Sequence, residues 1–213
     1  MPRQKLIIFD IDGTLYRSDE YEKELHRKIV ELLAERLGCS SEEAKAKLRM
    51  LRREVASISW CLIKLGINLR EFYAELAKRV NPSDYITEAK EVRDLLRKLK
   101  ESGFKLAAHT NSGKALALKV LGALGIEPST FDIIVTSDEA EPKPSRDGYL
   151  KILRLARMTA GEAVYVGDRY EVDLKTAKEL GIKTIMVGKG GTSRDVDFQV
   201  ENILEVEGLI LRD

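Results

Sequence analysis

The chain of 213 residues has few of the features that would place it among secreted, fibrous or membrane proteins. Its two cysteines, Cys39 and Cys61, form neither a CxxC pair nor a disulfide framework, which favours a reducing, cytoplasmic setting. With only 5 prolines and 15 glycines, collagen-like and low-complexity classes are excluded. No apolar run approaches the ~20 residues that span a bilayer, and the N-terminal run at 6–9 is too short for a secretory signal.

The chain also lacks an excess of charge of either sign. Lys and Arg total 36 against 35 Asp and Glu, a net charge of +1, so no long-range field favours nucleic acid or an anionic membrane as a partner. Glutamine and asparagine are scarce while 33% of the residues are charged, a composition that favours a heat-tolerant source. We therefore expect a globular protein with neither nucleic-acid nor membrane partners.

Short apolar runs alternate with amphipathic stretches along most of the chain. Strands are predicted at 6–9, 104–108, 133–135, 163–166 and 183–187, and helices between the later strands at 115–124, 149–156 and 174–180. Repetition of strand, helix and strand implies a parallel sheet with helices on both faces. The predicted fold class is α/β, with a doubly wound, Rossmann-like core.

One interval between strands is far longer than a crossover requires. Nearly 100 residues separate the first two strands, and they contain helical patterns at 22–37, from Ser40 to Gly66, from Asn68 to 80, and at 87–100. The second pattern, which opens on a capping box, is either one long helix or two helices bent near 57–59. The last pattern leads into the sheet. We predict a core made of residues 1–16 and 83–213, with an inserted helical cap at 17–82.

Polar side chains follow four of the predicted strands. In chain order they are Asp10 and Asp12, then Thr110 and Asn111, then Lys143, and finally Asp168 and Asp173. Ligands of open parallel sheets bind at the carboxyl ends of the strands, so these groups are expected to meet at one edge. Carboxylates gathered from separate strands need a cation, and oxygen-only ligands select a hard one such as Mg²⁺. Asp10 and Asp168 are the natural ligand pair.

This set of groups is suited to phosphoryl transfer. Asp10 can attack phosphorus in line and form an aspartyl-phosphate. Lys143, the Thr110 hydroxyl and backbone amides around Asn111 can hold the phosphate oxygens. Asp12 can protonate the leaving oxygen and later activate water.

The motifs Phe-Asp-Ile-Asp-Gly-Thr-Leu, Thr-Asn, Lys-Pro and Gly-Asp-x4-Asp, in that order, resemble the haloacid dehalogenase-like (HAD) hydrolase superfamily. The resemblance covers the whole core, and the insertion matches the helical type of cap. It implies that Asp10 is the nucleophile and that Asp12 is the acid/base, with a main-chain carbonyl toward the metal. It further implies that Thr110 and Lys143 bind phosphate, that Asp168 binds Mg²⁺, and that Asp173 is an outer metal ligand.

Within the superfamily, Asp12 favours phosphatases over 2-haloacid dehalogenases, whose leaving halide needs no proton. The segments 10–16, 84–99 and 120–126 are similar to the pyrimidine 5′-nucleotidase-like branch, although the cap departs from it around Trp60 and Cys61. We therefore expect a Mg²⁺-dependent phosphomonoester hydrolase acting on a small metabolite, either a nucleotide monophosphate or a sugar phosphate. The alternatives are a sugar-phosphate mutase, a dehalogenase and a non-catalytic binding protein.

Other features have simpler interpretations. His109 is interpreted as a buried strand histidine, the basic run 49–53 as the solvent-facing side of a helix, and 188–193 as a surface loop. Tyr16, Trp60 and Lys64 are candidate specificity residues.

Overall fold

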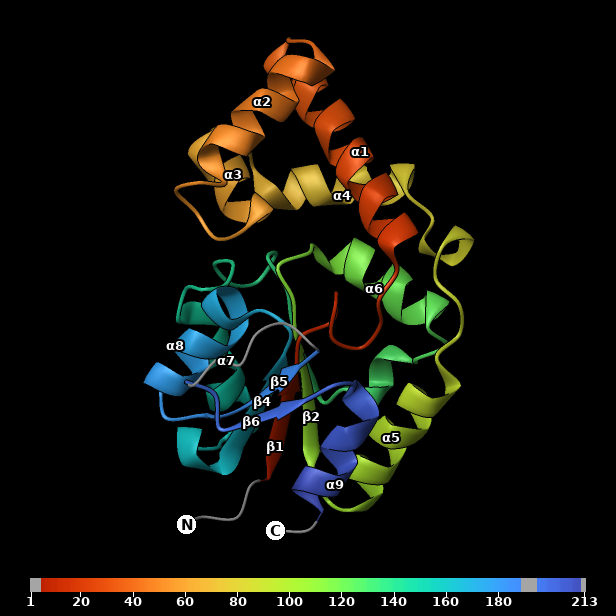
Figure 1. The fold of residues 1–213 in the computed structure, drawn as a ribbon, viewed down its shortest axis with the longest axis vertical. Coiled ribbons are helices and arrows are strands. Elements are labelled where there is room, and N and C mark those ends of the chain that lie inside the picture. Colours follow the sequence, from red (N-terminus) through yellow and green to blue (C-terminus); the bar gives the residue numbers. More distant parts are fainter. Residues whose placement is uncertain (1–4, 189–194, 212–213) are drawn as a thin grey trace.

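The computed structural model describes residues 5–188 and 195–211, and their strands form one parallel sheet with the order β3-β2-β1-β4-β5-β6 (Figure 1). The strands are β1 (Leu6–Phe9), β2 (Lys105–His109), β3 (Ile133–Val135), β4 (Ala163–Gly167), β5 (Lys183–Val187) and β6 (Phe198–Val200). The predicted α/β class with a doubly wound core is confirmed.

Helices cover both faces of this sheet because successive strand side chains point to opposite sides. Ile7 and Phe9 pack in the cluster that includes α5 (Lys90–Glu101), α6 (Lys114–Ala123) and α9 (Val206–Ile210). Leu6 and Ile8 pack on the other side, against α7 (Asp147–Ala156) and α8 (Lys175–Glu179). All four β1 side chains are fully buried, which explains the uninterrupted apolar run.

The predicted strands agree with the structure to within one residue at each end. The strand that the sequence analysis missed is β6, which pairs with β5 over three residues and has an exposed Phe198. Strand β3 is equally short but is the continuous apolar run Ile-Ile-Val, whereas the polar Gln199 interrupts β6. Most of the loop predicted at 188–193 lies outside the described residues.

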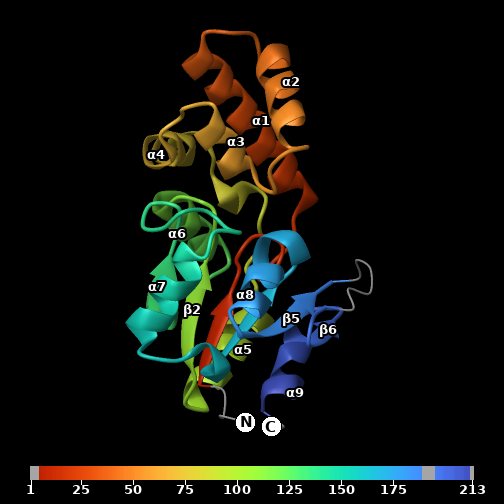
Figure 2. The same cartoon turned by 90° about the vertical axis from the view of Figure 1, so that its left-hand side faces the viewer.

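Four helices lie together over the carboxyl ends of the strands (Figures 1 and 2). They are α1 (Asp19–Leu37), α2 (Ser41–Leu51), α3 (Ile58–Lys64) and α4 (Leu69–Arg79). The second predicted pattern is therefore two helices, separated by residues 52–57, and the Ser57 hydroxyl accepts the Trp60 N–H to cap α3. The cap-and-core division at 17–82 stays a prediction.

Several helix starts differ from the predicted positions by one to three residues. Helix α1 begins at Asp19 rather than residue 22, and α7 begins at Asp147 rather than residue 149. Helix α5 begins at Lys90 rather than residue 87, and the Ala89 N–H before it donates to the Leu124 carbonyl. A π-helical turn at Tyr170–Leu174 precedes α8. None of the helices in residues 5–188 and 195–211 has the length and apolarity needed to cross a membrane.

His109 at the end of β2 is buried, as predicted. Its ring packs edge-on against Tyr149, with 4.7 Å between centroids, and its Nδ1 lies 3.2 Å from the Tyr165 hydroxyl. Gly148 faces the other ring nitrogen so closely that a Cβ there would lie 2.2 Å from Nε2.

Two helical glycines give a matched test of this packing. Gly148→Ala should lower the free energy of unfolding by about 1–3 kcal/mol, because the His109 ring is enclosed and cannot move away. Gly122→Ala, with nothing within 4 Å of the new methyl group, should raise it by up to about 1 kcal/mol. Urea denaturation measures both values; equal effects of the two substitutions would contradict this account.

Candidate active site

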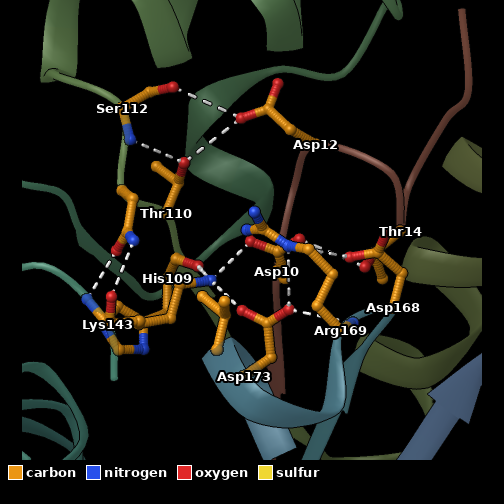
Figure 3. Close-up of polar contacts among 12 residues, drawn as sticks. Asp10, Asp12, Thr14, His109, Thr110, Ser112, Lys143, Asp168, Arg169 and Asp173 are labelled. Carbon is orange, nitrogen blue, oxygen red and sulfur yellow. Dashed lines mark hydrogen bonds and ion pairs between the residues drawn. The ribbon is translucent and has the colours of Figure 1, made fainter. Parts of the chain in front are cut away.

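Asp10 directly follows β1, and both of its carboxylate oxygens are held in a buried position (Figure 3). Its backbone N–H donates to the Val166 carbonyl on β4 at 2.9 Å, which fixes the main chain at the edge of the sheet. The Thr14 hydroxyl donates to Oδ2 at 3.2 Å, and the Lys143 ammonium donates to Oδ1 at 2.5 Å. Asp10 is therefore fixed at the floor of the site.

Lys143 is fully buried and lies between two carboxylates. Its Nζ is 2.7 Å from Asp173 Oδ1 and also donates to the His109 carbonyl at 2.9 Å. Burial on its own lowers the pKa of a lysine, but the charges of Asp10 and Asp173 outweigh that effect and raise the pKa of Lys143. The group therefore stays an ammonium.

The predicted phosphate-binding residue Asn111 has its side chain engaged with the Lys143 main chain. Its Nδ2 donates to the Lys143 carbonyl at 3.0 Å, and its Oδ1 accepts the Lys143 N–H at 2.6 Å. This reciprocal pair joins the loop after β2 to the loop that contains Lys143. The side chain thus positions Lys143.

Asp10, Asp168 and Asp173 form an acidic cluster in which one carboxylate oxygen from each lies within 4.8 Å of the others. Asp168 follows β4, and Asp173 comes from the π-helical turn. Burial, opposed by Lys143 and aided by Asp173, raises the pKa of Asp10 to about 7. Burial, followed by the charge of Asp173, raises the pKa of Asp168 to about 6. In both cases burial is the largest cause of the shift, and the neighbouring charge of Asp173 adds to it.

The donor set of this cluster fits a hard divalent cation. It consists of oxygen atoms alone, and Asp168 Oδ1 is buried with no hydrogen-bond donor among the described residues. The structure therefore brings together three of the four predicted metal ligands. The Asp12 carboxylate is not part of the cluster, so any metal contact of that residue would involve its main chain.

The Asp12 carboxylate is oriented by three hydroxyl groups. Tyr16 donates to Oδ1 at 2.6 Å, and Thr110 and Ser112 each donate to Oδ2 at 3.3 Å. Thr110 and Ser112 follow β2, so these bonds connect the loops of two neighbouring strands. Thr110, predicted to bind phosphate, is placed beside Asp12 at the same edge.

The sequence analysis missed three residues of this site. Thr14 lies within the Asp-x-Asp-Gly-Thr motif, and Ser112 stands two residues after Thr110, so both had a signal in the sequence. Arg169 had none except its position after Asp168; its Nε lies 3.6 Å from carboxylate oxygens of both Asp168 and Asp173.

A cavity of about 740 Å³ lies between this floor and helices α1–α3. From the strand ends it is lined by Asp10, Asp12, Gly13, Tyr16, Arg17, Thr110, Asn111, Ser112, Asp168 and Arg169. The helical side includes Tyr21, Glu22, Leu25, His26, Ile29, Lys45, Leu48, Arg49, Arg52, Ile58 and Ser59. The cavity is therefore lined from both sides.

The interpretation of 49–53 as a solvent-facing run agrees with the structure, since Arg49, Met50, Arg52 and Arg53 are all exposed. Arg49 and Arg52 also line the open cavity. Helical periodicity places these two arginines on the same face as the buried Leu48, and that face borders the cavity.

Of the three candidate specificity residues, Tyr16 lines the cavity, whereas Trp60 and Lys64 make other contacts. Lys64 pairs with Glu54 at the surface. Trp60 donates its indole N–H to the Pro142 carbonyl at 3.1 Å, and the neighbouring Ser59 hydroxyl donates to the Asn111 carbonyl at 3.1 Å. Helix α3 is thus bonded to the two loops that hold the phosphate-binding candidates.

The family model for haloacid dehalogenase-like hydrolases matches residues 7–187. The chain belongs to this family. It is 31% identical to the phosphoglycolate phosphatase of Aquifex aeolicus over 186 residues, covering 85% of this chain and 84% of that one. It is 29% identical to the glyceraldehyde 3-phosphate phosphatase of Methanocaldococcus jannaschii, covering 87% of this chain and 86% of that one.

A solved structure has the same arrangement. The HAD phosphatase from Thermococcus onnurineus superposes with a TM-score of 0.73 at 25% identity, covering 97% of this chain and 98% of that one. The prediction of a HAD-like enzyme whose relatives are phosphatases is confirmed. The nucleotidase-like branch and the individual residue roles stay predictions.

Gly13 gives a test of how closely the site is packed. Its φ is +90°, and a Cβ there would lie 2.4 Å from Asp168 Oδ2. Gly66 has a similar φ of +73° but nothing within 4 Å. Both Gly→Ala changes should cost about 1 kcal/mol of stability through the left-handed backbone. Only Gly13→Ala should also lower phosphate release from p-nitrophenyl phosphate, by more than about tenfold, because Asp168 is displaced. Equal activities of the two variants would contradict the close packing.

Proposed function

We propose that the protein is a Mg²⁺-dependent phosphomonoester hydrolase that acts on a small phosphorylated metabolite through an aspartyl-phosphate intermediate. The observation that supports this most directly is the state of Asp10. It is a buried carboxylate held by Lys143 and Thr14, it lies in a cluster with Asp168 and Asp173, and it lines the cavity.

The acidic cluster supports the choice of metal. Asp10 and Asp168 would hold Mg²⁺, with Asp173 behind them bonded to Lys143 and the Arg169 backbone. When bound, the ion supplies positive charge that lets a phosphate dianion approach the floor of the site.

The chain's own residues account for the two chemical steps. In the first, an Asp10 oxygen bonds to phosphorus, the bond from phosphorus to the leaving oxygen breaks, and Asp12 gives that oxygen a proton. In the second, Asp12 takes a proton from water, whose oxygen attacks the same phosphorus and releases inorganic phosphate and free Asp10. Lys143 offsets negative charge throughout.

The hydroxyls around Asp12 are compatible with both of its protonation states. The Thr110 and Ser112 oxygens can accept as well as donate a hydrogen bond. A protonated Asp12 can therefore donate a hydrogen bond to the Thr110 or the Ser112 oxygen before substrate binds, and the ionised form accepts a hydrogen bond from both.

The position of the cavity between the strand ends and the helices above them favours a small metabolite over a phosphoprotein. The names of the relatives point to two- and three-carbon phosphates such as phosphoglycolate and glyceraldehyde 3-phosphate, beside the nucleotide and sugar phosphates suggested by the motifs. A solved β-phosphoglucomutase from Clostridium difficile shares the fold at 16% identity, which supports the architecture alone. The relatives at 29% and 31% identity are named phosphatases, so we prefer hydrolysis to the mutase alternative. Neither Cys39 nor Cys61 forms a disulfide, which supports a cytoplasmic location.

The function is tested by phosphate release from a panel of phosphorylated metabolites with Mg²⁺ or with a chelator. The wild-type protein should release phosphate only with Mg²⁺, and Asp10→Asn should lower kcat by at least about a thousandfold, because the nucleophile is removed. Asp94→Asn, at an exposed ion pair on α5, is the matched control and should retain full activity. Turnover that survives chelation or Asp10→Asn would refute the proposal.

A further inference from the structure

Helix α2 lies over the carboxyl ends of the strands (Figure 1), and basic side chains from it and from the residue after it line the same cavity as Asp10. Lys45, Arg49 and Arg52 line the cavity together with Leu48. Their spacing of four and three residues places them on one face of the helix and its continuation. Lys45, Arg49 and Arg52 together form the basic wall of the cavity.

Contacts within the protein do not account for this basic wall. Lys45 and Arg49 make no ion pair or side-chain hydrogen bond among the described residues, and Arg52 donates only to the Val55 carbonyl of its own loop at 3.3 Å. The nearby Glu43 carboxylate is engaged with the Ser40 backbone N–H and hydroxyl. Like charges at this spacing repel one another slightly, so the arrangement costs stability unless an anion binds there.

Helix dipoles explain other charges in the cavity better than they explain the basic wall. Asp19 and Glu22, the acids on the helical side, lie in the first turn of α1, where negative charge is favoured. A dipole also favours Arg49 in the last turn of α2. Arg49, Arg52 and Arg53 are all exposed, but only Arg49 and Arg52 line the cavity, and a dipole does not select that side. Lys45 lies in the middle of the helix.

A second observation points to a polar ligand in the same cavity. Tyr21 is only 2% exposed and lines the cavity, and its hydroxyl has no hydrogen-bond partner among the described residues. Burial and the charge of Asp12 raise its pKa, so the phenol stays neutral. A buried hydroxyl without a partner costs free energy, which a polar ligand atom would recover.

Resting on the proposed phosphatase function, we propose that the natural substrate has a second anionic group, a carboxylate or a second phosphate, that binds the basic wall while its scissile phosphate lies at Asp10. One cavity contains both ends, and the apolar side chains of Leu25, Leu48 and Ile58 line it as well. The protein is then selective for phosphorylated acids or bisphosphates over neutral phosphomonoesters such as glyceraldehyde 3-phosphate.

Matched substrate pairs test this selectivity. The acids are 2-phosphoglycolate, 3-phosphoglycerate and fructose 1,6-bisphosphate, and their partners without the second charge are 2-hydroxyethyl phosphate, glycerol 3-phosphate and fructose 6-phosphate. At least one acid should have a kcat/KM about tenfold above its partner, and which acid it is distinguishes a carboxylate from a phosphate subsite.

Substitutions in the basic wall assign the selectivity to its residues. Arg49→Gln and Arg52→Gln should each lower the acid-to-neutral ratio of kcat/KM by about tenfold, the effect of losing one charge-assisted hydrogen bond, mainly through KM. Arg49→Lys, which keeps the positive charge, should have an acid-to-neutral ratio between those of Arg49→Gln and the wild-type protein. Lys47→Gln and Arg53→Gln remove charges from exposed residues of the same region that do not line the cavity, and they should leave the ratio unchanged.

The outcomes separate this inference from the function on which it rests. No phosphate release from any compound, including p-nitrophenyl phosphate, would refute the hydrolase itself. Release with equal kcat/KM for acids and their neutral partners would overturn the second anionic group alone. If Arg49→Gln and Arg52→Gln lowered kcat/KM equally for the acids and for their neutral partners, the basic wall would act by general electrostatic steering. That result would also overturn the second anionic group.

Discussion

The site depends on one buried ammonium group between two carboxylates. Lys143 lies 2.5 Å from Asp10 and 2.7 Å from Asp173, and none of the three is more than 1% exposed. Taking these charges out of water is costly, so their mutual attraction and the hydrogen bond to the His109 carbonyl must offset the loss of hydration. Asp168 adds a third carboxylate, and Arg169 lies 3.6 Å from carboxylate oxygens of both Asp168 and Asp173. Three carboxylates against these two cations leave negative charge on the floor, where a divalent cation would fit.

Parallel pairing brings these groups together although they are far apart in the sequence. In the register of the sheet, Phe9 on β1 lies beside Ala108 on β2 and Val166 on β4. The residues that follow these positions therefore emerge at the same level. Asp10 consequently lies beside the His109 carbonyl that helps to hold Lys143 (Figure 3). The short distances among these site residues therefore follow from strand pairing, although the residues are far apart in the sequence.

The sequence predicted the floor of the site better than its opposite wall. A strand buried on both faces is a continuous apolar run, so β1 and the polar residues after it are easy to recognise. The partners that Arg169 finds depend on the π-helical turn, which has no clear sequence pattern. Periodicity places Arg49 and Arg52 on one exposed helix face, but a sequence pattern does not distinguish the border of an open cavity from the rest of the surface. Only the packing of α2 against its neighbours shows that this face borders the cavity.

Helix α3 connects the helical wall to the catalytic floor through main-chain atoms. Ser59 donates to the Asn111 carbonyl and Trp60 to the Pro142 carbonyl, and these residues are next to Thr110 and Lys143. Because backbone carbonyls accept these bonds, the docking of the helices does not depend on the side chains that perform the chemistry. The cavity face of α2 is not part of this contact. Substitutions there can change which substrate fits while Asp10, Lys143 and the acidic cluster keep their positions, so the two walls can evolve separately.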